Sequence, residues 1–300
     1  MSKAVSPSVG RPYGLARVCE VWKIARSTVY EQRRRARTTR VPARRGPIGP
    51  CTDETLLKHI RAVLEQSPWV GEGHRKVWAM LRFKGIRTSR RRVLRLMRDN
   101  ELLAPVRAGR ARGPIVHDGT IIPDRPDRMW GLDATATMTG AGQATIFILV
   151  DHCTGECLGI HAARRGTRFE ALEPVRQAVR SSLGDFGRDV AAPSELKLRH
   201  DHGSQFVSHA FQEEIAFLGI RSSPSFVRTP QGNGCAERFI RTLKEQLLWL
   251  RRFETVADLV AALHAFKDQF NGTWIMQRHD YRTPRQQRDS LIAHAAEAAA

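Results

Sequence analysis

The positive charge of this 300-residue chain is confined to one end. Residues 1–114 hold 27 Lys and Arg against 8 Asp and Glu, whereas residues 115–300 hold 22 of each. The whole net charge of +19 therefore lies in the first part. A basic segment joined to a neutral one is typical of a DNA-binding part attached to a different functional unit. A solubilising basic tail is the alternative, but the helical apolar repeat within the basic segment argues against it.

The cysteines and the apolar segments exclude two classes of protein. Five cysteines are scattered along the chain and form no regular disulfide framework. No stretch approaches the ~18–20 apolar residues that a membrane span needs, and the first residues lack the apolar core of a signal peptide. We therefore expect a reducing, cytoplasmic setting and no membrane partner.

Residues 1–36 have the outline of a helix-turn-helix unit. Apolar residues between positions 15 and 22 repeat at helical spacing, and Ser27 is predicted to cap a second, basic helix. In DNA-binding proteins of this design the second helix enters the major groove, so Arg33 and Arg34 are expected to contact DNA. The Pro-, Gly- and Arg-rich residues 37–50 predict a basic linker.

Residues 51–104 predict a second helical DNA-binding domain. Apolar repeats indicate three helices, and five arginines fall within nine positions of the third one. Such a cluster repels itself unless a polyanion neutralises it. We therefore expect Arg91, Arg92 and Arg95 to contact DNA phosphates, with a solvated basic face as the alternative. Residues 105–128 predict a further linker.

From residue 129 the pattern changes from helical to mixed. Strands are predicted over residues 129–137, 144–150, 157–162 and 195–200, and helices over residues 169–183, 206–218 and 235–250. The second of these strands is a continuous apolar run, which is typical of a buried strand. The order of elements predicts a mixed α/β core over residues 129–290. An Ala-rich tail, expected to be a frayed helix, follows over residues 291–300.

Three acidic residues of this core stand out by position. Asp133 lies inside the first predicted strand, Asp201 directly follows the fourth, and Glu237 lies in the last helix. If the first and fourth strands are neighbours, the two aspartates come together, and a helix that crosses the sheet can supply the glutamate. Three clustered carboxylates cannot all stay ionised without a counterion. The pattern therefore predicts a site for Mg²⁺, with Mn²⁺ as a substitute, in which paired cations hold the attacking and leaving oxygens.

The sequence around these acids resembles that of a known family. Asp201 and Glu237 have 35 residues between them, and the three acids lie in the sequence motifs WGLDAT, HDHGSQF and TPQGNGCAERFIRTLKEQL. The last motif follows the family order of proline, asparagine, glutamate and a basic residue, here Pro230, Asn233, Glu237 and Lys244. Over nearly its whole length the chain resembles the OrfB-type transposases of the IS-three family of insertion sequences. Their catalytic core is similar to that of retroviral integrases.

The resemblance implies a ribonuclease-H-like fold and a two-step reaction on DNA. It implies magnesium-dependent cleavage at the ends of a mobile element, followed by attack of the released 3′-hydroxyl on target DNA. Asp133, Asp201 and Glu237 would be the catalytic and metal-binding residues. The implied partners are double-stranded DNA, further copies of the chain that hold two element ends, and an OrfA-type protein or a fusion with one. A bacterial cytoplasm, in association with the nucleoid, is the expected location.

Three residues near Glu237 are candidates for DNA contact. Lys244 follows Glu237 by about two helical turns and Arg241 by one, so these residues share a helix face at ~3.6 residues per turn. The alternative interpretation is that Arg241 and Lys244 are surface charges without a role in DNA contact. Asn233 is expected either to bind a phosphate or to cap the helix of Glu237. Gly203 is expected to allow a tight turn.

Two features leave other interpretations open. The residues His152, Cys153, Cys157 and His161 have a spacing within the range of zinc motifs, but a hairpin would send these side chains to different faces. The segment after the core reads FNGTWIMQRHDYRTPRQ and lacks the Arg-Pro-His word of many relatives. This departure leaves a catalytically inactive DNA-binding relative or regulator as an alternative. A ribonuclease-H-type nuclease that only hydrolyses its substrate is a further one.

Overall fold

The computed structural model describes residues 3–37, 51–105, 122–225 and 233–299. The chain forms two compact units, Met1–Gly49 and Pro50–Ala300, and each is described by itself. The predicted linker over residues 37–50 lies almost wholly outside the described residues, as does most of the linker predicted over 105–128. None of the described helices is long and apolar enough to cross a membrane.

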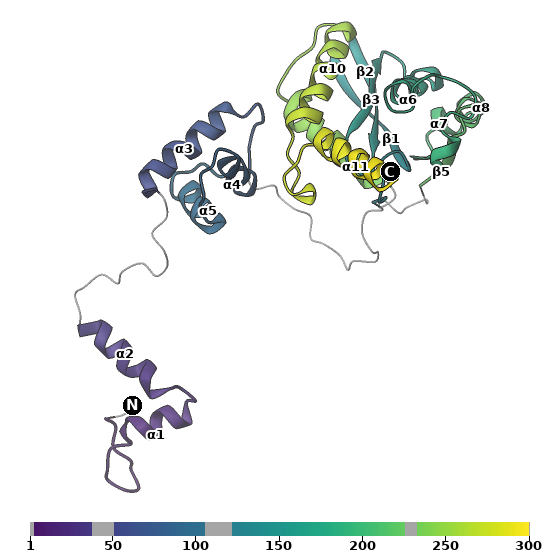
Figure 1. Ribbon diagram of the computed structural model, residues 1–300. Coiled ribbons are helices and arrows are strands. Elements are labelled where there is room, and N and C mark those ends of the chain that lie inside the picture. The colour runs from purple at the N-terminus through teal and green to yellow at the C-terminus, as the bar shows by residue number, and fades with distance from the viewer. Residues whose placement is uncertain (1–2, 38–50, 106–121, 226–232, 300) are drawn as a thin grey trace. The chain divides into compact units, whose positions relative to one another are not determined.

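The first unit contains the two predicted helices, α1 (Gly14–Val21) and α2 (Arg26–Arg37) (Figure 1). A short turn separates them, in which Lys23 adopts a left-handed φ of 50°. The predicted cap was wrong, because α2 begins at Arg26 and Ser27 lies inside its first turn.

Three helices form the first part of the second unit: α3 (Asp53–Gln66), α4 (His74–Phe83) and α5 (Arg90–Asp99). α3 begins where the Thr52 side chain accepts a hydrogen bond from the backbone N–H of Thr55, and Ser89 caps α5 in the same way. Each cap satisfies one backbone donor that the helix cannot pair internally. The apolar face of each helix turns inward to a shared core formed by Leu56, Ile60, Val63, Val77, Leu81, Val93, Leu96 and Met97.

A five-stranded mixed sheet forms the centre of the second unit. Its strands are β1 (Met129–Thr139), β2 (Gly142–Asp151), β3 (Cys157–Ala163), β4 (Lys197–His200) and β5 (Arg221–Pro224). They lie in the order β3-β2-β1-β4-β5, with β1, β2 and β3 antiparallel and β4 and β5 parallel to β1. This is the strand arrangement of the ribonuclease-H-like fold. The predicted fold class is confirmed, and so is the pairing of the first strand with the fourth.

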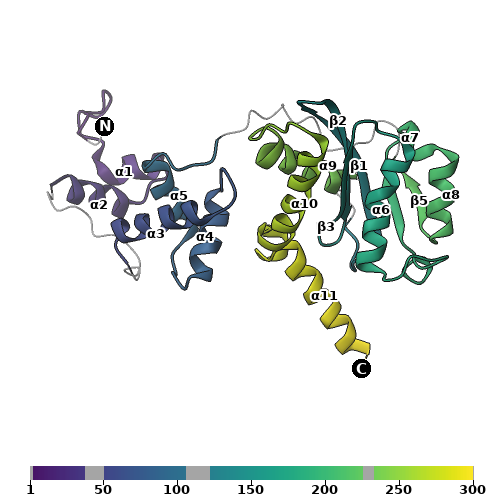
Figure 2. The same ribbon diagram turned by 90° about the horizontal axis from the view of Figure 1, so that it is seen from above.

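Helices cover both faces of the sheet (Figure 2). One face carries α6 (Arg168–Ser182), α7 (Ser204–Val207) and α8 (His209–Phe217), and the other carries α9 (Gly234–Leu243) and α10 (Val256–Thr273). Successive side chains of a strand point to opposite faces, so Trp130 and Leu132 pack beneath α6, whereas Ile146 and Ile148 pack beneath α9 and α10. Burial of each such side chain contributes ~1.5–3 kcal/mol.

Several elements differ from the sequence prediction. β5 was not predicted, because its sequence RSSP has no apolar alternation and it is held by pairing with β4. The helix predicted over 206–218 is divided at Ser208 into α7 and α8. The helix predicted over 235–250 leaves α-helical geometry after Leu243 and continues as a π-helical turn, Lys244–Leu248.

The last described helix is α11, which spans Pro284–Ala299. Short 3-10 turns occur at Ala192–Ser194 and Gln277–His279. The described residues of the predicted Ala-rich tail, 291–299, therefore continue α11. Arg288 ties this helix to the core, since its guanidinium forms ion pairs with Asp127 and Glu156.

Candidate active site

Asp133 lies in the middle of β1, the central strand of the sheet. Its neighbours Leu132 and Ala134 pack into the core beneath α6. The Asp133 side chain therefore lies on the opposite face, which α9 crosses. Its Oδ1 accepts a hydrogen bond of 2.8 Å from the backbone N–H of Ala134. The backbone of Asp133 is held by pairing with Ile148 of β2, whereas the pairing of β1 with β4 ends at Gly131.

Asp201 is the first residue after β4. β4 runs parallel to β1 with Gly131 opposite Arg199, so the two aspartates stand two residues beyond a paired position on adjacent strands. Asp201 Oδ1 accepts a hydrogen bond of 2.8 Å from the backbone N–H of Gly203.

The expected reason for a glycine at position 203 was wrong. Gly203 has an ordinary φ of −55°, so no left-handed turn requires it. The limited space around this residue favours glycine, because a Cβ there would lie 3.0 Å from Asp201 Oδ1 and 2.6 Å from Gln205 Nε2. The missing side chain lets the backbone N–H of this residue approach the Asp201 carboxylate.

Glu237 lies in the first turn of α9, and Asn233 directly precedes this helix. The expected capping bond is absent from the described residues, since the Asn233 side chain caps no backbone group of α9. Asn233 is instead buried, and its Nδ2 donates a hydrogen bond of 2.9 Å to the carbonyl oxygen of Leu132. Its other polar atom, Oδ1, has no partner among the described residues. The asparagine thus ties the start of the helix that carries Glu237 to the residue before Asp133.

This tie depends on close approach of α9 to the sheet. A Cβ on Gly131 would lie 2.5 Å from Asn233 Oδ1 and 2.7 Å from His152 Nε2. Any residue larger than glycine at this position would push α9 away from β1, because real side chains do not tolerate such short contacts.

The three acids are linked by their effect on the pKa of Asp133. This pKa is raised to about 6, chiefly by burial and also by the negative charges of Asp201 and Glu237, while the backbone N–H of Ala134 and the charge of Lys244 oppose the rise. Burial also raises the pKa of Glu237. Charges influence one another to this extent only at short range or in a poorly hydrated site. The charges of Asp201, Glu237 and Lys244 therefore reach the buried carboxyl group of Asp133.

The cation that the resemblance implies can be tested against these donors. Among the described residues, no three His, Cys, Asp or Glu side chains are arranged closely enough to enclose a metal ion. The donor chemistry fits nonetheless, since all three groups are carboxylates, the ligands that hard divalent cations prefer. Burial is the main cause of the raised pKa of Asp133, and a bound cation would favour the ionised carboxylate there.

The two cations predicted near Glu237 differ in their surroundings. Arg241 is exposed, and its Nε lies 3.1 Å from Glu245 Oε1 in an ion pair one helical turn along. Lys244 begins the π-helical turn and acts electrostatically on Asp133. Of the two, Lys244 is thus the one whose charge reaches the acids.

The arginines of α5 also divide into two groups. Arg92 Nε donates to Asp53 Oδ1 at 2.7 Å, and Arg95 donates to the other oxygen of the same carboxylate at 2.5 Å. Arg92 also donates to the carbonyl of Cys51 at 2.7 Å. These two arginines join α5 to the start of α3, and the mutual repulsion predicted for them is relieved within the protein. Arg91 is exposed and pairs with no carboxylate of the described chain.

In the first unit the predicted DNA-contacting residues are both exposed. Arg34 forms an ion pair of 2.9 Å with Glu31, one turn earlier on α2. Arg33 is exposed on the same helix. An exposed pair across one helical turn contributes little stability.

The zinc alternative finds no support in the described residues. β2 and β3 form the antiparallel hairpin that the sequence predicted. Cys153 and Cys157 are both buried, and burial raises the pKa of the Cys153 thiol to about 12. His161 bonds to Glu170 of α6, so its ring nitrogen serves the contact between strand and helix.

One feature beside the acids was not predicted from the sequence. Arg238 directly follows Glu237 and lines a cavity together with Arg278, far away in the chain. The only sequence signal was the position of Arg238 next to a candidate catalytic residue, because its partner comes from a segment without a recognised motif.

Comparison with known proteins agrees with this geometry. Residues 52–110 match an HTH-like domain, and residues 123–230 and 218–284 match an integrase core domain. A transposase for insertion sequence element IS629 from Shigella sonnei is 25% identical over 282 residues, which cover 91% of this chain and 90% of the relative. A putative transposase for IS986/IS6110 from Mycobacterium tuberculosis is 29% identical over 263 residues, covering 83% and 88%. The chain belongs to the integrase-core transposases of insertion sequences.

The expected resemblance to the IS-three family is thereby confirmed, and the function of this transposase is DNA transposition. The transposase therefore acts on DNA and is a polynucleotidyl transferase. Among solved structures it is similar to the catalytic core domain of BIV integrase, with 20% identity and a TM-score of 0.43 over 58% of this chain and 99% of that one.

Proposed function

We propose that Asp133, Asp201 and Glu237 are the catalytic residues of this transposase and that together they bind Mg²⁺, or Mn²⁺ in its place. The supporting observation is the raised pKa of Asp133, to which burial and the other two carboxylates contribute. A divalent cation bound there would neutralise the charge of the phosphate under attack and orient the attacking and leaving oxygens. The cytoplasm, in association with the nucleoid, is the proposed location.

The fold of the transposase positions the three carboxylates for the reaction. Asp133 is held by the central strand, Asp201 is oriented by the backbone N–H of Gly203, and Glu237 is positioned by the contact of Asn233 with Leu132. Lys244 lies where its charge can hold the DNA phosphate beside the acids. In the first step the end of the element is hydrolysed to a free 3′-hydroxyl. In the second, this hydroxyl attacks a target phosphodiester and displaces the 3′ oxygen of the target strand. Both steps depend chiefly on position and charge neutralisation.

The exposed cations are proposed to hold the DNA. Arg33 and Arg34 on α2, Arg91 on α5, and Arg241 on α9 all lie on the surface. Arg92 and Arg95 are engaged with Asp53, so we propose that they shape the DNA-binding surface instead of touching phosphates. A multimer that pairs two element ends, with an OrfA-type partner or fusion, completes the proposed assembly.

The proposal is tested with DNA that carries the ends of the element. Asp133→Asn, Asp201→Asn and Glu237→Gln are expected to abolish both end cleavage and joining in Mg²⁺, while Asp268→Asn, an exposed residue of α10, should retain both. Joining of pre-cut ends separates a transposase from a nuclease that only hydrolyses. Full joining by all three variants would refute the assignment.

A further inference from the structure

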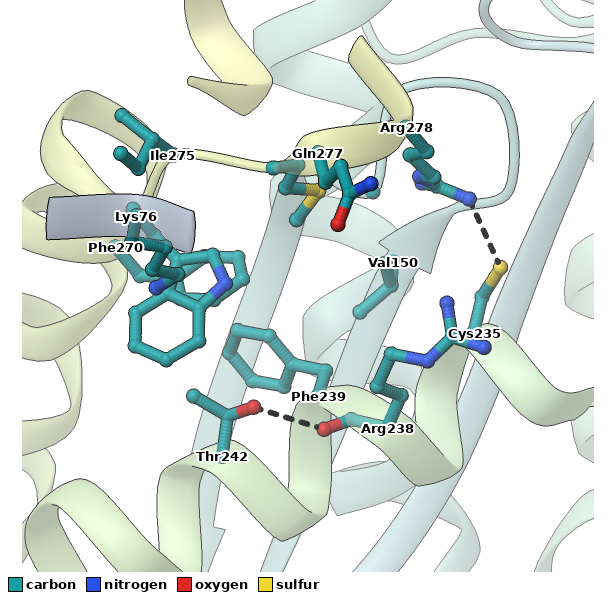
Figure 3. Close-up of a pocket in the computed structure, with 13 residues that line it drawn as sticks. Lys76, Val150, Cys235, Arg238, Phe239, Thr242, Phe270, Ile275, Gln277 and Arg278 are labelled. Carbon is teal, nitrogen blue, oxygen red and sulfur yellow. Dashed lines mark hydrogen bonds between the residues drawn. The ribbon is translucent and has the colours of Figure 1, made fainter. Parts of the chain in front are cut away.

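A cavity of about 340 Å³ lies beside α9 (Figure 3). Its wall includes positions 235, 238, 239 and 242 of this helix, which form one stripe at helical spacing. Glu237, Arg241 and Lys244 form the neighbouring stripe. None of the three candidate catalytic carboxylates lines the cavity, so it is a separate site that lies directly next to the reaction centre on the same helix.

Aromatic rings form one wall of the cavity. Phe239 and Phe270 meet edge to face with ring centres 4.9 Å apart, and Phe270 stacks on Trp274 at 5.7 Å. Phe239 and Phe270 are buried, whereas Trp274 is half-buried. A wall of this kind offers flat apolar surface to a planar ligand, and nucleic-acid bases are the planar groups that a DNA-processing protein meets.

Two arginines line another part of the cavity. Arg238 and Arg278 both lie near Cys235 in Figure 3, and neither pairs with a carboxylate of the described chain. Arg278 donates to His279 Nε2 at 3.0 Å and weakly to Cys235 Sγ at 3.9 Å, which leaves further N–H donors unused. No acidic residue lines the cavity. Two arginines that line one cavity without an acidic residue favour an anion, and guanidinium groups bind phosphate well.

Residues of α4 and the segment before it cover the ring of Trp274. Lys76 Nζ lies over this ring, 3.1 Å from its centre, and is held by Glu72 at 3.3 Å. Trp69, which precedes α4, packs edge to face against Trp274 with ring centres 5.0 Å apart. The HTH-like segment thus supplies Lys76 to the cavity and packs against its aromatic wall.

We propose that this cavity binds one unpaired nucleotide of the DNA strand that passes the reaction centre. The phosphate would lie between Arg238 and Arg278, and the base would stack on Phe239, because the ring of Trp274 is already covered by Lys76, Phe270 and Trp69. A volume of about 340 Å³ accommodates one nucleotide but excludes a base pair with its two backbones. The inference rests on the proposed function, because it assumes that DNA reaches Glu237. A frayed base at the end of an element would be held here while the scissile phosphate meets the acids.

The test is binding of synthetic duplexes in EDTA, so that no strand is cut. One duplex carries a two-nucleotide 5′ overhang with 2-aminopurine as its first unpaired base, and its control is blunt. We expect the transposase to bind the overhang duplex more tightly and to quench the 2-aminopurine by stacking. Arg238→Ala and Arg278→Ala should each weaken overhang binding roughly tenfold and leave blunt binding within twofold. Arg252→Ala, an exposed arginine outside the cavity, should change neither.

A second variant guards against loss of folding. Phe239→Leu removes the proposed stacking surface but also a buried ring. Thr242→Met is therefore tested as well, because it fills the cavity and keeps every cation. Both variants should abolish the quenching. The thermal unfolding of Thr242→Met should be the same as that of the unaltered protein. Equal affinity for overhang and blunt duplexes, or full quenching in Thr242→Met, would overturn the proposal. Asp133→Asn should bind and quench as the unaltered protein does, so a failure of the catalytic assignment is distinguishable from a failure of the cavity.

Discussion

Helices α5 and α9 are both amphipathic and rich in charged residues, but these residues have different partners in the two helices. On α5, Arg92 and Arg95 turn toward Asp53 of another helix and become part of the fold. On α9, Glu237 forms no ion pair among the described residues, and its negative charge acts on Asp133 as that of Asp201 does. Two α5 arginines are thus neutralised inside the protein, whereas the acids around α9 form the proposed cation site. A run of charges thus acquires its role from the element packed against it.

The strongest test of this contrast compares two glutamates of the same helical segment. Glu237→Gln is expected to lower DNA joining by at least ~10²-fold, because the lost charge belongs to the proposed cation site. Glu245→Gln should stay within a few-fold of the unaltered protein, because Glu245 pairs with Arg241 on the helix surface. Joining of pre-cut ends in Mg²⁺ gives both values. Equal losses in the two variants would contradict the special position of Glu237.

The second test concerns the fixing of α9 on the sheet. Gly131→Ala places a methyl group 2.5 Å from Asn233 Oδ1 and should lower the free energy of unfolding by ~1–3 kcal/mol. Joining should fall as well, since the displaced helix carries Glu237. Gly187→Ala is the matched control, because a Cβ there meets nothing within 4 Å. Urea denaturation followed by circular dichroism measures both, and a Gly131→Ala protein as stable as the control would show that α9 adapts freely.

The third test asks whether the inward arginines of α5 are structural. Arg92→Ala removes hydrogen bonds to Asp53 and to the Cys51 carbonyl and should cost about 1–2 kcal/mol of unfolding free energy. Arg91→Ala, one residue away and exposed, should cost less than ~0.5 kcal/mol. The same denaturation measurement serves for both. A larger loss in Arg91→Ala than in Arg92→Ala would reverse the assignment.

The smallest expected effect is on DNA binding by the exposed arginine. Each phosphate contact contributes ~0.9 to the slope of log affinity against log salt concentration for duplex DNA. Arg91→Ala should reduce that slope by about one unit, while Arg92→Ala, in conditions where it stays folded, should leave it unchanged. Fluorescence anisotropy with a labelled duplex between 50 mM and 200 mM salt gives the slope. An unaltered slope in Arg91→Ala would place the DNA elsewhere on this segment.

Local sequence was informative where a residue's role depends on its near neighbours. The apolar runs of β1, β2 and β3 predicted buried strands, because alternation and continuous apolar character depend on short-range periodicity. The spacing of Asp133, Asp201 and Glu237 within recognisable words predicted the family and the candidate acids. The same approach failed for β5, whose polar RSSP becomes a strand only by pairing with β4, and for the π-helical turn at Lys244–Leu248.

By itself the sequence determined the class of this protein: a basic helical part, a mixed α/β core, and three acids in the order and spacing of a DNA transposase. Only the tertiary structure decided which charges are free to act. Asp53 forms ion pairs with Arg92 and Arg95, two of the arginines predicted to contact DNA. The buried Asn233 joins the start of α9 to β1 through its hydrogen bond to Leu132. Arg238 meets Arg278 across a cavity from 40 residues away. The physical reason is that burial and charge pairing depend on distance in space, which residue spacing along the chain does not specify.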